Sequence, residues 1–375
     1  MPWGGALRRP AGTRRAAAPA RPAGGHRRRH HLSPRTADGA RPRRRHLATR
    51  LPPSGVAAPV RLLAIVGPTA TGKTRLAVAV ARQLGGELLN ADSRQVIRGL
   101  RVGTCAPAEA ELAGVPCHLL DLREPDQPFT AADWLDAAES ILAVVIGRGR
   151  QPVLVGGTGL YVSALIGGLD LAAVPPDAEH RADRAAQLRR PGGHEALVGE
   201  LRARDPTADI DVRNPRRLLR ALEILDARGA PLAAARRRGP ERPAVLIGLD
   251  LPAALHDEII RSRAEWMIRT AALVQEVDSA LRRGVSREAL DAAGIGYREA
   301  LALRDGRLSQ DGAVEALVQR TRRYAKAQRT WFRRDPRIRW IQRSEAAADS
   351  LVDEVIDALR EDARSGERLH RRRRP

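Results

Sequence analysis

The stretch RLLAIVGPTATGKTRLAVAVARQL, residues 61–84, decides the fold. Its first six residues form a short apolar run typical of a buried strand, and the residues from Thr74 onward carry apolar side chains at helical spacing. Between the two, Gly67–Thr74 fits the pattern G-x-x-x-x-G-K-[ST] at every position. Glycines in such a loop let backbone N–H groups surround phosphate oxygens at a helix N-terminus. The stretch therefore predicts a strand–loop–helix unit that binds a polyphosphate.

The predicted phosphate loop comprises Gly67, Pro68, Thr69, Ala70, Thr71, Gly72, Lys73 and Thr74. Lys73 is expected to place its charge on the terminal phosphate, and the Thr74 hydroxyl is expected to bind Mg²⁺. Only two of the 65 basic residues are lysines, Lys73 and Lys326. A codon bias toward arginine explains the scarcity of lysine; against that background each lysine is a candidate for a position where arginine would not serve, because an ammonium and a guanidinium are not interchangeable.

Strands and helices alternate after the loop, which predicts a mostly parallel sheet with right-handed crossovers. Further strands are expected at Glu87–Asn90, Cys117–Leu122, Pro152–Val155 and Ala244–Leu249. Helices are expected from Thr130 to Ile146 and at Leu255–Arg283, Arg287–Leu303 and Gly312–Arg334. The expected fold class is α/β: a P-loop NTPase-like parallel sheet flanked by helices, with a helical insertion domain.

The composition divides the chain into four parts. Residues 60–170 and 243–345 are expected to form the sheet core, 171–242 a charged helical insertion, and 346–375 a C-terminal helix with a basic tail. Residues 1–59 hold fourteen arginines against a single acid, Asp38, and few aliphatic residues. We interpret that segment as a disordered extension or a misassigned start, with a nucleic-acid-binding arm and a targeting segment as alternatives.

The remaining composition is ordinary for a globular protein. The hydrophobic fraction is 43%, and no apolar run approaches the roughly 20 residues that a membrane span needs. Cys105 and Cys117 have no CxxC spacing, so neither a disulfide framework nor a zinc cluster is expected. A cytoplasmic monomer without a membrane partner is the expected state.

Two further strand ends carry polar residues. Asp92-Ser93-Arg94-Gln95 follows the second strand, and Gly156-Gly157-Thr158-Gly159-Leu160-Tyr161 follows the strand at Pro152–Val155. Because the carboxyl ends of parallel strands share one edge, Asp92 should face the phosphate loop, ready to accept a proton. An Asp that caps the next helix and a tight strand–helix turn are the alternatives at these two positions.

The motifs together resemble the tRNA dimethylallyltransferases, or tRNA isopentenyltransferases, from about Val60 to Ile341. The resemblance is carried by GPTATGKT at 67–74, NADSRQ at 90–95, RVGTCAP at 101–107, CHLLDL at 117–122, FTAADW at 129–134, PVLVGGTGLYVSAL at 152–165, NPRRLLRALEIL at 214–225, GIGYREAL at 294–301 and TRRYAKAQRTWFRRDPRIRWI at 321–341. Each piece except the first is weak alone, but nine in the same order are hard to reproduce by chance.

The resemblance implies a specific reaction. A dimethylallyl group passes from dimethylallyl diphosphate to the exocyclic N6 amine of the adenine 3′ of the tRNA anticodon, position 37, and diphosphate is released. In this reading the phosphate loop and Mg²⁺ hold the donor, Asp92 takes the amine proton, and Lys73, Thr74 and Arg263 act on the diphosphate. The positions implied to contact tRNA are Asp92, Ser93, Arg94, Gln95, Thr158, Arg181, Arg216, Arg217, Arg220, Gly296, Tyr297 and Arg298.

Four departures from the family pattern bear on the site. Ile97 and Ala106 stand where Tyr and Lys are common, so a phenol and a cation near the donor are lost. Arg216 replaces a usual Gln, and Ala327 replaces a common Arg. These departures put donor affinity and turnover in question more than the fold.

Several alternatives remain at this point. A P-loop nucleotide or small-molecule kinase would bind ATP, with Asp121 as an acid at a strand end. A basic RNA-binding protein with a vestigial loop would bind RNA and form no product. The arginines of 213–220 are either a phosphate-tracking stripe or a solvated face, and the aromatic residues Tyr324, Trp331 and Phe332 are either stacking platforms or core.

Overall fold

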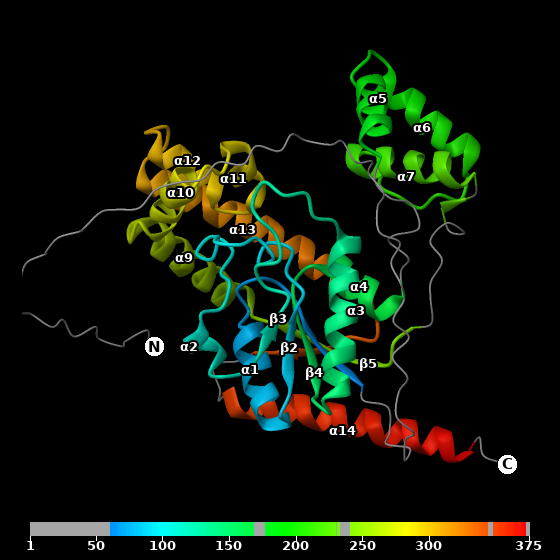
Figure 1. Cartoon of the computed structure of the whole chain (residues 1–375), viewed down its shortest axis with the longest axis vertical. Helices are drawn as coiled ribbons and strands as arrows, with labels where there is room; N and C mark the ends of the chain where they lie inside the picture. The colour runs from blue at the N-terminus through cyan, green and yellow to red at the C-terminus, as the bar shows by residue number, and fades with distance from the viewer. Residues whose placement is uncertain (1–60, 169–176, 230, 233–240, 344–347, 373–375) are drawn as a thin grey trace, which may run out of the picture. The chain divides into compact units, whose positions relative to one another are not determined.

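The computed structural model describes residues 61–168, 177–229, 231–232, 241–343 and 348–372 (Figure 1). The predicted disordered extension at 1–59 and the end of the predicted basic tail lie outside the described residues. None of the described helices is long and apolar enough to cross a membrane.

Six strands in the described part of the chain form a parallel sheet in the order β3-β2-β4-β1-β5-β6. Their bounds are β1 Leu62–Val66, β2 Glu87–Asn90, β3 Cys117–His118, β4 Pro152–Gly156, β5 Ala244–Asp250 and β6 Arg339–Gln342. The central strand β1 pairs with β4 on one side and β5 on the other, with Ile65 opposite Val155 and Ile247. Since all strands run in one direction, the loops after β1, β2 and β4 gather at one edge.

In the described chain each strand is followed by one or more helices. They are α1 Lys73–Leu84, α2 Glu109–Leu112, α3 Ala131–Gly147, α4 Gly159–Gly167, α5 Ala178–Leu188, α6 Gly193–Arg204, α7 Pro215–Arg228, α9 Ala253–Arg269, α10 Ala272–Arg282, α11 Arg287–Ala293, α12 Tyr297–Arg304, α13 Gln310–Phe332 and α14 Ala348–Arg372. The predicted fold class is confirmed.

The sheet is buried on both faces because successive side chains of its strands point alternately into two apolar clusters, one on each face. Leu63 and Ile65 of β1 pack with α1 and α14, which lie together in Figure 1. Leu62, Ala64 and Val66 point to the opposite face and pack with α3, α4, α9 and α13. A strand with apolar residues at both odd and even positions is the expected sequence for a covered parallel sheet.

Helices α5, α6 and α7 form a three-helix unit with its own apolar centre, which includes Leu197, Leu201, Leu218 and Leu222. Helix α7 begins where the Asn214 side chain accepts hydrogen bonds from two backbone N–H groups, with Pro215 as its first residue. Both features are strong helix-start signals. The helix ends at Gly229, whose φ of 62° suits glycine.

Four element predictions were wrong in detail. The expected helix at Arg287–Leu303 is two helices, α11 and α12, separated at residues 294–296. Strand β3 covers two residues instead of six, because Leu119 and Asp121 take left-handed backbone conformations (φ 67° and 53°). The expected helix at Leu255–Arg283 is two helices, separated where Ala271 has φ 58°. Strand β6 was not predicted at all, since its four residues include only two apolar ones.

Candidate active site

The phosphate loop joins β1 to α1 and needs glycine at both ends. Gly67 has φ 134°, and a Cβ there would lie 2.4 Å from the Leu249 carbonyl oxygen of β5. Gly72 has φ 90° and is the N-cap of α1. The first glycine therefore permits close packing on the neighbouring strand, and the second turns the chain into the helix.

Lys73 is buried at the start of α1, and its ammonium donates a hydrogen bond to the Pro68 carbonyl of its own loop. Burial lowers the pKa of Lys73 to about 8; the Asp92 carboxylate opposes this effect and the Arg263 guanidinium adds to it. These three charged groups thus lie near one another although they come from distant parts of the sequence. At neutral pH the ammonium still carries most of its charge.

Thr69, in the middle of the loop, is held on both sides of its backbone. Its N–H donates to Gln328 Oε1 at 2.8 Å, and its carbonyl accepts from His256 Nε2 at 2.8 Å. Because the carbonyl can only accept, Nε2 carries the proton, and Nδ1 accepts from Arg329 at 3.2 Å. Arg329 in turn makes a two-pronged ion pair with Asp250 at the end of β5. His256 is therefore a neutral ring, and burial lowers its pKa accordingly.

Asp92 stands immediately beyond β2, with its carboxylate in the same neighbourhood. Its Oδ1 accepts from the Arg94 N–H at 2.9 Å. Burial raises the pKa of the Asp92 carboxyl above its ordinary value, although the Arg94 N–H and the Lys73 charge work in the opposite direction. A carboxylate with a raised pKa is a better proton acceptor at neutral pH than an ordinary one.

The turn after β4 is tied to the segment after β2. Thr158 Oγ1 accepts from the Ser93 N–H at 2.9 Å and donates to Ser93 Oγ at 3.2 Å. The Thr158 N–H donates to the Ala91 carbonyl at 3.0 Å. Thr158 therefore fixes the backbone on either side of Asp92.

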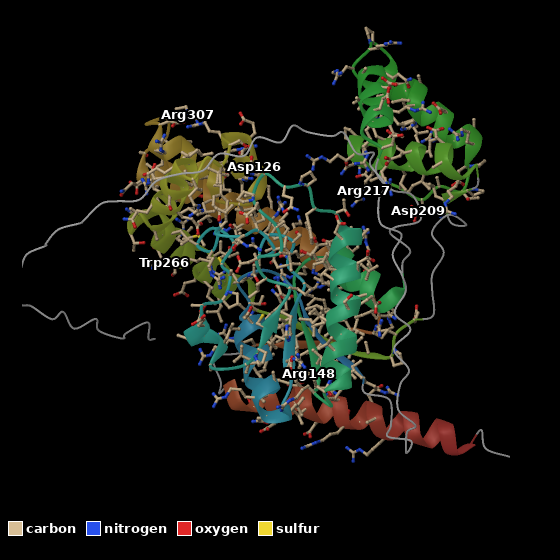
Figure 2. The ribbon with its side chains drawn as sticks, viewed as in Figure 1. Asp126, Arg148, Asp209, Arg217, Trp266 and Arg307 are labelled. Carbon is tan, nitrogen blue, oxygen red and sulfur yellow. The ribbon has the colours of Figure 1, made fainter. Side chains whose placement is uncertain are left out.

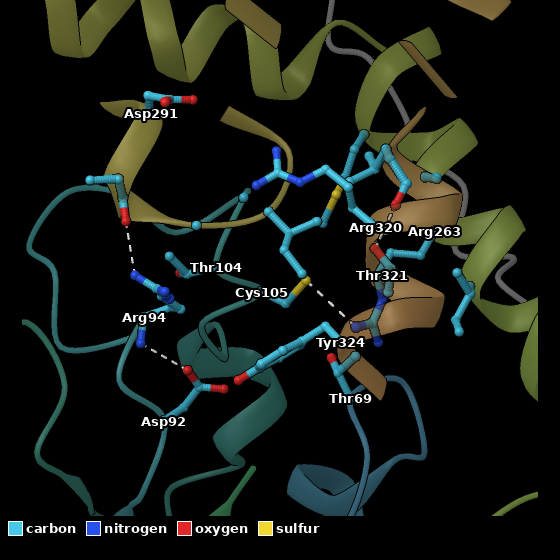
Figure 3. Close-up of a pocket in the computed structure, with 18 residues that line it drawn as sticks. Thr69, Asp92, Arg94, Thr104, Cys105, Arg263, Asp291, Arg320, Thr321 and Tyr324 are labelled. Carbon is cyan, nitrogen blue, oxygen red and sulfur yellow. Dashed lines mark hydrogen bonds between the residues drawn. The ribbon is translucent and has the colours of Figure 1, made fainter. Parts of the chain in front are cut away.

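A cavity of about 160 Å³ brings the two sides of the site together. Thr69 of the loop, Asp92 after β2 and Arg263 of α9 all line it (Figure 3). In Figure 3 the Tyr324 hydroxyl lies beside the Asp92 carboxylate. Burial and the Asp92 charge both raise the pKa of Tyr324, so its phenol stays protonated at neutral pH. The Arg263 Nη1 atom is 3.6 Å from Cys105 Sγ on the opposite wall.

The loop that carries Cys105 is held from outside the cavity by Glu276 of α10. The carboxylate accepts from the backbone N–H groups of Arg101, Val102 and Gly103 and from the Tyr297 hydroxyl. A Cβ at Gly103 would lie 2.5 Å from the Tyr297 ring. Tyr297, predicted to contact tRNA, is a fully buried support of this loop.

Other predicted tRNA-contacting residues near the cavity already have protein partners. Arg94 is exposed and donates to the Ala292 carbonyl at 2.8 Å. Gln95 donates to the carbonyls of Thr104 and Cys105. Arg298 is the second residue of α12, whose N-cap is Gly296, and it makes a two-pronged ion pair with Asp291.

The predicted tRNA-contacting arginines of the insertion fall into two groups. Arg181 and Arg220 both bind the buried carboxylate of Glu223, so part of their charge is balanced. Arg216 and Arg217 lie on the exposed first turn of α7, and Figure 2 labels Arg217 on that surface. The exposed pair is the better placed to meet a polyanion.

One face of α13 belongs to the site; Tyr324 and Trp331 were expected as stacking platforms or core, and Gln328 was not expected there. Tyr324, Gln328 and Trp331 stand at positions i, i+4 and i+7, the spacing of a single helix face. Tyr324 lines the cavity, Gln328 contacts the loop, and the Trp331 ring occupies the space where a Cβ at Gly159 would lie. The helical spacing was available in the sequence, but the partners of this face were not.

These features define a class of protein: an α/β fold of the P-loop type, with one cavity shared by the phosphate loop, a carboxylate and an arginine. Residues 95–335 match the sequence model of a family described as IPP transferase. The tRNA dimethylallyltransferase of Geobacillus thermodenitrificans is 39% identical over 303 residues, 79% of this chain and 95% of that protein. The corresponding protein of Roseiflexus sp. is 40% identical over 309 residues, 80% of this chain and 100% of its own length.

A solved structure agrees. The tRNA isopentenylpyrophosphate transferase of Bacillus halodurans superimposes with a TM-score of 0.63 at 34% identity, covering 83% of this chain and 99% of that one. The chain therefore belongs to the IPP transferase family, the tRNA dimethylallyltransferases.

Proposed function

We propose that the chain transfers a dimethylallyl group from dimethylallyl diphosphate to the exocyclic N6 amine of adenine 37 of tRNA. The names of its relatives support this reaction, and one observation in the chain itself carries it. Thr69 of the phosphate loop and the Asp92 carboxylate line the same cavity, with Arg263 on a third wall. A donor diphosphate at the loop and an amine at the carboxylate would thus meet at one cavity.

The reaction balances with the groups present. A bond forms between N6 of the adenine and the allylic carbon, and the bond from that carbon to the diphosphate oxygen breaks. The N6 proton passes to Asp92, whose raised pKa suits it for this role. Negative charge grows on the departing diphosphate, where Lys73, Arg263 and the loop N–H groups would stabilise it.

Mg²⁺ fits the oxygen ligands that the loop offers. Thr74, the second residue of α1, supplies a partly exposed hydroxyl next to Lys73. Among the described residues there is no group of three or more His, Cys, Asp or Glu that could hold a metal ion. Mg²⁺ usually keeps several waters and binds substrate phosphates, so Thr74 and the diphosphate would be its ligands. When bound there it supplies positive charge to the leaving group.

The RNA side of the proposal uses two regions. Residues near the cavity, including Ser93, Thr158 and Arg298, would contact the anticodon loop, whose unpaired bases can be turned out of the stack. Arg216 and Arg217 would contact phosphates, with Arg181 and Arg220 beside them. We infer a cytoplasmic location, since tRNA and a water-soluble diphosphate are the proposed substrates, and we propose that the chain acts as a monomer.

One experiment tests the proposal directly. Purified protein, Mg²⁺, labelled dimethylallyl diphosphate and an anticodon stem-loop with adenine at position 37 should yield labelled RNA. Asp92→Ala should reduce kcat by at least about 100-fold, the order expected for loss of a general base, while RNA affinity stays within about threefold. Unlabelled RNA with the wild-type protein, or phosphoryl transfer from ATP, would contradict the proposed reaction. A normal rate with Asp92→Ala would contradict only the assignment of the base.

A further inference from the structure

Gln328 of α13 makes two hydrogen bonds that join the halves of the cavity. Its Oε1 accepts from the Thr69 N–H of the phosphate loop at 2.8 Å, and its Nε2 donates to the Gly157 carbonyl after β4 at 2.9 Å. The side chain is only 5% exposed. A single buried amide thus bridges two backbone segments, one that follows β1 and one that follows β4.

Each of the two Gln328 hydrogen bonds ends on a segment next to the proposed site of one reactant. Thr69 lies in the loop that would hold the diphosphate. Gly157 is bonded directly to Thr158, which accepts from the Ser93 N–H next to Asp92. The Gln328 side chain therefore adds a link between the donor loop and the segment that holds the carboxylate, beyond the point where the β1–β4 pairing ends at Val66 and Gly156.

An amide is the chemical group that this position requires. One bond needs an acceptor and the other needs a donor, and a neutral carboxamide offers both. The Gly157 backbone approaches so closely that a Cβ there would lie 2.2 Å from Gln328 Nε2. Neither a shorter side chain nor a charged one can reproduce both contacts in this space.

We propose that Gln328 is a positioning residue that holds the phosphate loop and the Gly157–Thr158 turn at the separation needed for prenyl transfer. The proposal rests on the proposed function, because the separation matters only if donor and acceptor meet in this cavity. Gln328 acts through Thr69 and Gly157 and touches neither reacting atom. A misplacement of about 1 Å can cost on the order of 100-fold in rate.

The test compares Gln328→Ala and Gln328→Glu with a matched control, Gln319→Glu. Gln319 lies on an exposed part of the same helix, so it controls for a new charge on α13. Gln328→Ala should lower kcat about 100-fold and change the KM for dimethylallyl diphosphate by less than about threefold. Gln319→Glu should leave both constants within about twofold of the wild type.

Gln328→Glu gives a readout that a purely structural role would not produce. An ionised carboxylate cannot donate to the Gly157 carbonyl, but a protonated carboxyl can, and burial raises the pKa of a carboxyl. The activity of Gln328→Glu relative to the wild type at the same pH should therefore rise at least fivefold as the pH falls from about 8 to 6. Because a carboxylate at position 328 also shifts the pKa values of Asp92, Lys73 and His256, the pH dependence is compared with both the wild type and Gln328→Ala. Gln328→Ala should show no such recovery.

The outcomes separate this proposal from the proposed function. Absence of labelled RNA with the wild-type protein would contradict the function, and with it the reason for the bridge. An active wild type with unchanged kcat in Gln328→Ala would overturn the bridge alone. So would a Gln328→Glu to wild-type ratio that is flat with pH.

Discussion

At the scale of single residues, Lys73 shows how burial sets the charge of a site. Its ammonium is enclosed, and burial brings its pKa down to about 8. A cation that is poorly solvated in the free protein would give up little hydration on binding the proposed diphosphate. The same burial leaves it sensitive to mildly alkaline conditions.

We predict that pyrophosphate binding to the free protein weakens as the pH rises through about 8, because Lys73 loses its proton there. Lys73→Arg should bind more weakly overall and lack this loss of affinity near pH 8, since a guanidinium does not titrate in this range. Calorimetry with Mg²⁺ and pyrophosphate between pH 6.5 and 9.5 measures both. Lys326→Arg, at the other lysine, should leave the alkaline transition at the wild-type pH. A wild-type affinity that varies with pH in the same way as that of Lys73→Arg would show that Lys73 does not titrate there.

At the scale of elements, helix α13 gathers residues that the sequence keeps far apart. Thr69 and Gln328 are separated by 259 positions, yet their hydrogen bond spans 2.8 Å. The same helix presents Trp331 to Gly159, the first residue of α4. The docking of α13 on the β4–α4 turn therefore holds much of the site in place.

Gly159→Ala should destabilise the fold by about 1–3 kcal/mol, because the new methyl group would lie 2.2 Å from the Trp331 ring. Urea denaturation measures the loss. Gly167→Ala, at the other end of α4, is the control. A Cβ there meets nothing within 4 Å, so that variant should be neutral or slightly more stable. If the two variants were equally stable, the Trp331 side chain would shift to make room for the new methyl group at little cost in free energy.

The sequence predicted the features that depend on neighbouring residues and missed those that depend on contacts between residues far apart in the chain. The strand–loop–helix at residues 61–84 and the position of Asp92 at a strand end are local patterns, and they gave the fold class correctly. The break at Ala271 and the shortness of β3 depend on left-handed backbone at non-glycine residues, for which the sequence has no signal. Gln328, His256 and Glu276 were missed because each acts on a segment more than 170 residues away.

At the scale of the whole molecule, charge is distributed unevenly. The net charge is +21, but many arginines near the cavity and in the insertion are paired with carboxylates. Arg216 and Arg217, at the start of α7, are exposed. Their contribution to RNA binding should therefore show in the dependence on salt rather than in catalysis.

Arg216→Ala and Arg217→Ala should each weaken anticodon stem-loop binding and reduce the salt slope, d log K against d log [salt], by about 1. Pyrophosphate affinity should not change, because neither residue lines the cavity. Arg202→Ala on the exposed face of α6 removes the same charge elsewhere in the insertion and should have a smaller effect. Slopes that are identical for all three variants would argue against specific phosphate contacts on α7.

The segments of the chain that line the cavity are separate from the insertion, and this separation bears on how the protein can evolve. Its residues come from 69–105 and 260–324, and none of the described residues of α5, α6 and α7 contributes to it. The chain leaves the sheet after α4, builds a unit with its own apolar centre, and returns as β5. The length and surface of that excursion can therefore change in evolution without altering the cavity; under the proposed function, such changes would alter the RNA contacts and leave the site of prenyl transfer intact.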